Sequence, residues 1–149
     1  MAGAIKFTIF VKRQRMRGND SPLENTFIFV TSDNCPQMDS WPDGGYTPFR
    51  GAKGTTWESG VRVPGIAYLK GVIQPGRVSD GLFDLMDLFD TSLTLAGIGT
   101  ANLPDDRYYD GIDQTSFLLT DQGESLRENI YFWLGSSLTA MRMRSGHTC

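Results

Sequence analysis

The stretch Asn25–Pro64, NTFIFVTSDNCPQMDSWPDGGYTPFRGAKGTTWESGVRVP, decides how this chain folds. It opens on the run Thr26–Thr31, whose β-branched and aromatic residues are apolar on both faces, as is typical of a strand inside a covered sheet. The run breaks into the pair Asp33-Asn34 and continues through Pro and Gly residues to a polar group around Lys53. Such a strand holds the ends of a loop in place, so the loop after it is a natural location for a functional site.

Composition bounds the class of protein around this stretch. The chain has 149 residues, 40% of them hydrophobic and 21% charged, which indicates one globular domain. The formal net charge is −3, yet residues 1–17 contain five basic residues and no acid. We interpret this basic start as a solvated terminus, since no aromatic interleaving or groove-binding motif supports a nucleic-acid partner.

Apolar patterning argues against a membrane partner. No apolar run approaches the roughly 18 residues that span a bilayer. The basic cluster follows the apolar residues 1–11 instead of preceding them, which is the wrong order for a signal peptide, so we expect none in this chain and the localisation stays unknown. The cysteines, Cys35 and Cys149, have no CxxC spacing and predict free thiols and no zinc site, with a disulfide between them left open.

The remaining pattern predicts a few further elements. Ile5–Val11 could form a strand or a short helix, inside a lead-in whose order depends on its packing. Val61–Leu69 indicates a second strand, and Gln74–Gly76 a turn. Ile130–Leu134 and Leu138–Met143 predict an antiparallel hairpin around residues 135–137.

The spacing also predicts a helix over Asp80–Ala96, with Ser79 or Asp80 as N-cap and Gly97 as C-cap. Apolar residues would then share one helical face, namely Leu82, Leu85/Met86, Phe89, Leu93 and Ala96. The alternative is an extended piece over residues 82–86 followed by a helix from about Asp90.

Oxygen and ammonium groups make the loop chemically interesting. Asp33 and Asn34 offer a carboxylate and an amide oxygen, which hard cations such as Ca²⁺ favour. The alternative is an Asx-turn, in which both side chains bond nearby backbone N–H groups. Lys53 lies between Gly51 and Gly54, so it could hold an anion, or it could be a solvated loop lysine.

Other polar residues carry weaker signals. Arg50 and Arg62 could add positive potential or pair with acids. We interpret Asp39, Asp43 and Glu58 as solvated carboxylates, and His147, three residues from the end of the chain, as a frayed histidine. The serines have no GxSxG context, so no serine triad is indicated.

Several separated motifs together resemble a known family. TSDNCP, PFRGAKGTTWESGVRVPG and QPGRVSDGLFDLMDLFDTSLTLAG, followed by DGIDQTSFLL and YFWLGSSLTAMRMR, resemble the C-terminal half of the arylsulfatase family, in the alkaline-phosphatase-like superfamily. The resemblance covers residues 25–144. It implies an α/β fold, a partial alkaline-phosphatase-like mixed sheet with helices, plus a small antiparallel C-terminal subdomain. The implied division is 1–24 as a basic lead-in outside the family, 25–98 as part of the α/β domain, and 99–149 as a truncated subdomain.

The resemblance also implies roles for the loop residues. Asp33 and Asn34 match metal ligands to an active-site Ca²⁺, and Lys53 matches the lysine that binds the sulfate of a sulfate ester substrate. Cys35 stands where the family usually has glycine, which suggests strain in the loop.

A second departure concerns the reactive centre. The family's formylglycine nucleophile is made from a Cys-x-Pro-x-Arg box, and this sequence contains none. We therefore expect a sulfatase fragment that is inactive alone, with a non-catalytic sulfatase-like interaction module as the alternative. Half of a sheet leaves edges uncovered, so self-association is a further expectation.

Overall fold

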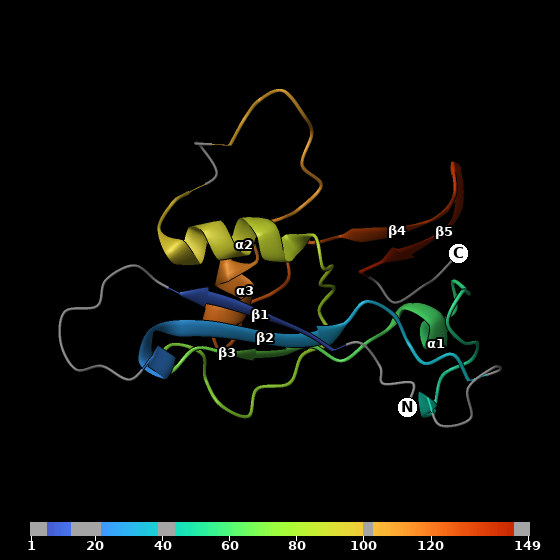
Figure 1. Ribbon diagram of the computed structural model, residues 1–149, viewed down its shortest axis with the longest axis horizontal. Coiled ribbons are helices and arrows are strands. Elements are labelled where there is room, and N and C mark those ends of the chain that lie inside the picture. Colours follow the sequence, from blue (N-terminus) through green and yellow to red (C-terminus); the bar gives the residue numbers. More distant parts are fainter. Residues whose placement is uncertain (1–5, 13–21, 39–43, 100–102, 145–149) are drawn as a thin grey trace.

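The computed structural model describes residues 6–12, 22–38, 44–99 and 103–144. Helices cover one face of a small sheet, and a separate hairpin lies toward the same end of the molecule as α1 (Figure 1). The elements in chain order are β1 Lys6–Lys12, the 3₁₀ helix η1 Pro22–Asn25, β2 Thr26–Ser32, α1 Glu58–Val61, β3 Ile66–Tyr68, α2 Asp87–Ala96, α3 Thr115–Leu119, β4 Asn129–Leu134 and β5 Ser137–Met143. None of the helices in these ranges has the length and hydropathy needed to cross a membrane.

The sheet has the order β1-β2-β3, with β2 in the centre. Both of its strand pairs are antiparallel, with Phe29 opposite Ile9 on one side and Ala67 on the other. The expectation of a mixed sheet is therefore wrong for the described strands. Antiparallel neighbours need only a connection that returns along the sheet, whereas a parallel pair needs a crossover over the sheet face. The structure also decides that the segment from Lys6 is a strand, not a helix.

The core lies between the central strand and the helices. Phe27 and Phe29 of β2 are 2% and 5% exposed. They form one apolar cluster with Leu88 of α2 and with residues of α3 and the loop after β3, namely Phe117, Leu118 and Leu69. Burying each such side chain contributes on the order of 1.5–3 kcal/mol. The prediction of a strand over Thr26–Thr31 is confirmed, but only one of its faces is buried, because Ile28 and Val30 on the other face are half-buried.

Helix α2 begins at Asp87, not at Asp80, which agrees better with the alternative of a non-helical piece over residues 82–86 followed by a helix from about Asp90. Two hydrogen bonds lie in the turn before the helix: the Asp84 N–H donates to Asp87 Oδ2 at 2.9 Å, and Asp84 Oδ1 accepts the Met86 N–H at 3.2 Å. Met86 is the N-cap and its side chain makes no capping hydrogen bond, so the prediction of Ser79 or Asp80 as N-cap is wrong. The C-terminal prediction is confirmed, since Gly97 adopts a left-handed conformation with φ of 75°.

The buried face of α2 differs from the predicted apolar face. Asp87, Leu88 and Thr91 are buried, whereas Phe89 is 48% exposed and stacks on Tyr109 with the ring centroids 5.7 Å apart. Polar side chains occupy the inner face because they bond to the segment that follows α2 in the chain. The apolar periodicity alone therefore selected the wrong face.

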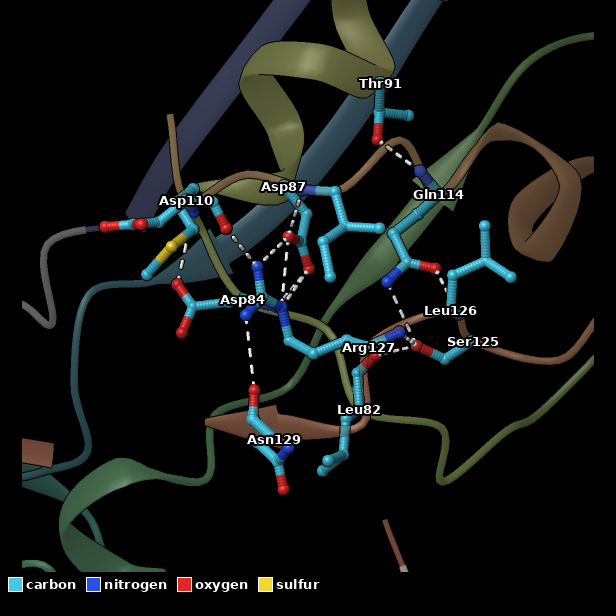
Figure 2. Close-up of polar contacts among 12 residues, drawn as sticks. Leu82, Asp84, Asp87, Thr91, Asp110, Gln114, Ser125, Leu126, Arg127 and Asn129 are labelled. Carbon is cyan, nitrogen blue, oxygen red and sulfur yellow. Dashed lines mark hydrogen bonds and ion pairs between the residues drawn. The ribbon is translucent and has the colours of Figure 1, made fainter. Parts of the chain in front are cut away.

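One buried ion pair joins α2 to the segment before β4 (Figure 2). Arg127 Nε donates to Asp87 Oδ1 and Oδ2 at 3.1 and 2.9 Å, and Nη2 donates to the Asp110 carbonyl at 2.7 Å. The Asp87 carboxylate also accepts the backbone N–H groups of Ile112 and Asp84, both at 2.9 Å. The Asp87 side chain is fully buried and that of Arg127 is 8% exposed, so this is an interior contact.

Gln114 makes a second polar connection beside it (Figure 2). Its backbone N–H donates to Thr91 Oγ1 and its Nε2 to Ser125 Oγ, both at 3.0 Å. Its Oε1 accepts the Leu126 N–H at 3.1 Å, while Ser125 Oγ donates to the Leu82 carbonyl. These bonds attach the C-terminal segment to the helix at several points, because each buried polar group must find a partner.

The C-terminal hairpin of β4 and β5 confirms the predicted antiparallel pair. Gly135 supplies a φ of 59° at the turn, and the register shifts between Phe132 and Trp133. A two-stranded hairpin is marginally stable by itself. Its position therefore depends on contacts with the rest of the chain, such as the Arg127 hydrogen bond to the Asn129 carbonyl at 3.2 Å.

Candidate functional site

Two loops meet at the end of β2. The Lys53 N–H donates to the Pro36 carbonyl at 3.2 Å, which joins the loop after β2 to the loop that carries the lysine. The structure thus brings the segment containing Asp33 and Asn34 beside the segment containing Lys53. These residues are the ones that the sequence singled out for a cation and an anion.

Asp33 is exposed and Asn34 is partly exposed. Across the described parts of the chain, neither side chain takes part in a hydrogen bond or ion pair; the backbone carbonyl of Asn34 accepts a bond from Ser32 Oγ at 3.0 Å. The alternative of an Asx-turn would require bonds from both side chains to backbone N–H groups, and none is present among these residues. Among the described residues, the carboxylate and the amide therefore have no partner that would compete with a ligand.

Lys53 is exposed at the tip of its loop. Its ammonium makes no ion pair with any described residue. Gly51 and Gly54 on either side have φ values of 94° and 89°, a region that favours glycine. A Cβ at Gly51 would also lie 2.6 Å from Thr55 Oγ1, so glycine is needed there for space as well as conformation.

The short helix α1 supports both loops. The Ser59 N–H donates to the Arg50 carbonyl at 3.0 Å, and the Gly60 carbonyl accepts the Cys35 N–H at 3.4 Å. Ser59 is fully buried and its Oγ accepts a bond from Thr47 Oγ1 at 2.7 Å. A Cβ on Gly60 would lie 2.1 Å from the Thr55 carbonyl oxygen, so the loop packs directly on this glycine.

The arginines and Glu58 have partners inside the protein. Arg62 pairs with Glu58 at 3.3 Å and with Asp80 at 2.6 Å. The Arg50 guanidinium lies over the Trp57 ring, 4.1 Å from its centroid. Glu58 also pairs with Arg142 of β5, so the expectation that it is a solvated carboxylate is wrong. The other candidates, Asp39, Asp43 and His147, lie outside the described residues.

Cys35 is a buried free thiol, 5% exposed, and Cys149 lies outside the described residues. The Sγ of Cys35 donates to the Arg62 carbonyl at 2.8 Å, and burial raises the pKa of this thiol. No described residue other than glycine has a positive φ, Cys35 included. The expectation of strain at this position is therefore wrong, because the backbone adopts a conformation that any residue tolerates.

The donor set fits part of a calcium site. Ca²⁺ takes about six to eight oxygen ligands. Asp33 and Asn34 supply oxygen atoms of the preferred kind, but the described residues contain no cluster of three or more acidic, histidine or cysteine side chains placed to hold a metal. Oxygen ligands of the kind that Ca²⁺ prefers therefore lie in the loop that is hydrogen-bonded to the loop of Lys53.

Sequence reasoning missed the residues that support these loops. Ser59 and Arg142 carried no local signal, because their roles depend on contacts with segments distant in the chain. Glycine at position 60 is the one residue with a sequence clue, since it follows a loop already rich in glycine.

Taken together, helices on one face of a sheet and an acid–amide pair at a strand end beside the loop of Lys53 define a protein of helices and sheet with polar groups gathered in the loops after β2. A sequence model described as Sulfatase matches residues 19–98, more than half of the chain, and the chain belongs to the sulfatase family. The resemblance inferred from the separated motifs is thereby confirmed.

Individual relatives agree with this assignment. N-acetylgalactosamine-6-sulfatase of Canis lupus familiaris is 43% identical over 122 residues, covering 80% of this chain and 22% of the relative. Arylsulfatase of Hemicentrotus pulcherrimus is 36% identical over 121 residues, covering 80% and 21%. The crystal structure of the PsFucS1 sulfatase from Pseudoalteromonas sp. is 56% identical with a TM-score of 0.77, covering 82% of this chain and 24% of that one. The chain thus spans about a fifth of the length of the curated relatives it matches.

Proposed function

We propose that this chain forms one side of the active site of a sulfuric ester hydrolase. In this site Asp33 and Asn34 are ligands to Ca²⁺, and Lys53 binds the sulfate oxygens of the ester. The observation that carries the proposal is the hydrogen bond between Lys53 N–H and the Pro36 carbonyl, which places the two loops side by side. The three side chains lack partners among the described residues, as ligand-binding groups should.

The chemistry follows from charge. A sulfuryl group carries negative charge that must be stabilised while it is attacked and while the alcohol leaves. The Lys53 ammonium supplies a fixed positive charge beside these oxygens, and bound Ca²⁺ adds Lewis-acid stabilisation. The sequence lacks the Cys-x-Pro-x-Arg box that the family converts to its nucleophile, so we propose that the chain alone binds but does not turn over sulfate esters.

Anion binding tests the role of Lys53. Titration with sodium sulfate, followed by amide chemical shifts, should show saturable changes in residues 51–55. Lys53→Ala should abolish these changes because the ammonium is the charged group at the loop tip. The matched control is Lys70→Ala, since Lys70 is exposed and paired with Glu24 away from the site. Equal sulfate binding by Lys53→Ala and wild type would contradict the assignment.

Cation binding tests Asp33 and Asn34. Calorimetry with CaCl₂ should give a dissociation constant weaker than about 10⁻⁴ M, since two ligands leave most of the coordination shell to water. Asp33→Asn should remove this binding, whereas Asp121→Asn, at an exposed turn, should not. Micromolar affinity would show a more complete site than proposed, and binding that is indifferent to Asp33 would contradict the ligand role.

The second candidate function is a non-catalytic sulfatase-like module, and the missing nucleophile box favours it for the isolated chain. The two candidates separate in a turnover assay with a chromogenic aryl sulfate and Ca²⁺. We expect no turnover above the Lys53→Ala variant. Turnover that depends on Lys53 would establish an enzyme and contradict the inactive interpretation.

We also propose self-association through the sheet edges. The outer strands are β1 and β3, and in β3 the side chains of Ile66 and Tyr68 are 62% and 43% exposed. Uncovered strand edges pair readily with other chains. Light scattering at increasing concentration should show oligomers in the wild type and fewer in Ile66→Lys. A monomer throughout the concentration series would contradict this proposal.

A further inference from the structure

The hairpin of β4 and β5 contacts α1, the helix that is hydrogen-bonded to the loops of Cys35 and Lys53. Arg142 of β5 pairs through Nη1 with Glu58 Oε1 at the start of α1. The side chains of Arg142 and Glu58 are 21% and 27% exposed, so the contact is largely removed from solvent and weakly screened. The other oxygen of Glu58 accepts a bond from Arg62 at 3.3 Å. Glu58 thus pairs with two arginines, Arg62 directly after its own helix and Arg142 of the hairpin.

Glu58 lies next to the residues that hold the loops. Ser59 bonds to the Arg50 carbonyl, and the Gly60 carbonyl accepts a bond from the Cys35 N–H. Gly60 leaves no space between α1 and the lysine loop, since an added Cβ would meet the Thr55 carbonyl oxygen at 2.1 Å. A shift of α1 would therefore move the loop of Lys53 with it, because closely packed segments transmit displacement.

We propose that Arg142 is a positioning residue for the Lys53 loop, acting through Glu58 and α1. The hairpin thereby sets the placement of the sulfate-binding lysine without touching the anion. The effect on sulfate affinity rests on the proposed function, whereas the effect on the loop does not.

The experiment compares Arg142→Met with Arg144→Met in the full chain. Arg144 is the matched control, since it lies one residue after β5 and its pair with Glu124 is exposed, with side chains 44% and 78% accessible. The first measurement is hydrogen exchange of the hydrogen-bonded amides of Lys53, Thr55 and Ser59. The second is the dissociation constant for sodium sulfate.

In Arg142→Met we expect exchange of these three amides to rise by about tenfold or more, because local opening is governed by the contacts that hold a segment. The amide of Leu118 in α3, bonded to the Gln114 carbonyl at 3.0 Å, should be unchanged. Sulfate affinity should fall about fivefold or more, as expected when a binding group is misplaced. Arg142→Lys should restore part of both effects, and Arg144→Met should show neither.

The outcomes separate the two proposals. Unchanged loop exchange in Arg142→Met would overturn the positioning role, whatever happens to sulfate. If the wild type binds no sulfate, the proposed function fails while the exchange data still decide the role of Arg142. Should Arg142→Met fail to fold by circular dichroism, Glu58→Gln replaces it, since it removes the opposite charge of the same ion pair at nearly constant shape. Equal exchange in Glu58→Gln and wild type would then overturn the proposal.

Discussion

Replacing Arg127 by Met removes the centre of the polar network between α2 and the C-terminal segment (Figure 2). Met keeps much of the length of the side chain but has no donors. The change leaves the Asp87 carboxylate buried without its countercharge, and it removes donors from the carbonyls of Asp110 and Asn129. We expect a large loss of stability because an uncompensated buried charge is expensive.

The size of the loss follows from the partners that remain. Breaking a buried ion pair from one side costs roughly 3–5 kcal/mol. Asp87 keeps two backbone donors, Ile112 and Asp84, so the expected loss in the free energy of unfolding is near the lower limit, about 3 kcal/mol. Domains have only about 5–15 kcal/mol in total. The variant should therefore lose a large fraction of its stability.

Companion variants separate charge from geometry. Arg127→Lys keeps the charge but cannot reproduce the planar fork, so we expect an intermediate loss of about 1.5–3 kcal/mol. Adding Asp87→Asn to Arg127→Met removes the orphaned charge and keeps one acceptor oxygen. This double variant should recover about 1 kcal/mol relative to Arg127→Met alone.

Urea unfolding followed by circular dichroism and tryptophan fluorescence measures these losses. With a slope of about 2 kcal/mol per M, a loss of 3 kcal/mol lowers the midpoint by about 1.5 M. Hydrogen bonding to Asp87 raises the pKa of Arg127 above its ordinary value. The stabilisation from this pair is complete below the ordinary pKa of arginine and is lost only above the raised pKa, so the loss should be constant from about pH 6 to 9.

The control is Arg107→Met, whose exposed pair with the neighbouring Asp106 should leave the midpoint unchanged. A loss below about 1 kcal/mol in Arg127→Met would contradict this prediction, because it would mean that Arg127 does not compensate the buried charge of Asp87. An equal loss in the Arg107→Met control would refute it as well.

Three further predictions concern single positions. Burial raises the pKa of Asp90, and the charges of Asp113 and Asp87 raise it further. The contribution of Asp90 to stability is complete below the ordinary pKa of 3.8 and is lost as the pH rises through the raised pKa. Asp90→Asn should therefore raise Tm at pH 7, by about 2–4 °C per kcal/mol, but not at low pH, and a gain independent of pH would contradict this cause. Gly60→Ala should cost about 1–3 kcal/mol in urea unfolding and weaken sulfate binding, because its Cβ would meet backbone; an unperturbed loop in amide spectra would count against the packing argument. Cys35→Gly should lower stability by about 1 kcal/mol, since the backbone there needs no glycine, and a rise in Tm would restore the strain interpretation.

Local sequence patterns were sufficient to predict some of the elements. The strand Thr26–Ser32 and the hairpin around Gly135 were predictable because their residues carry strand and turn preferences that the tertiary structure does not oppose. The end of α2 at Gly97 was predictable for the same reason. These features depend on neighbours in the chain, which a single sequence displays directly.

Other elements could not be predicted because they depend on contacts with residues far away in the chain. The predicted start of α2 at Asp80 and its predicted apolar face were wrong because Asp87 and Thr91 turn inward to bond with residues 112–127. Helix α1 was missed because its short turn is held by the Lys53 loop and by Arg142 instead of by helical preference. Tertiary hydrogen bonds outweigh the apolar periodicity at these positions.

The family and the residue types at the candidate site can be recognised from the order of residues alone: an acid–amide pair after a buried strand, and a lysine between glycines. These are properties of residue type and local spacing. The contact of the Lys53 loop with Pro36, the negative φ at Cys35 and the pairing of Arg142 with α1 appear only in the folded chain. These contacts join segments far apart in the chain, so their energies exist only after folding has brought the segments together.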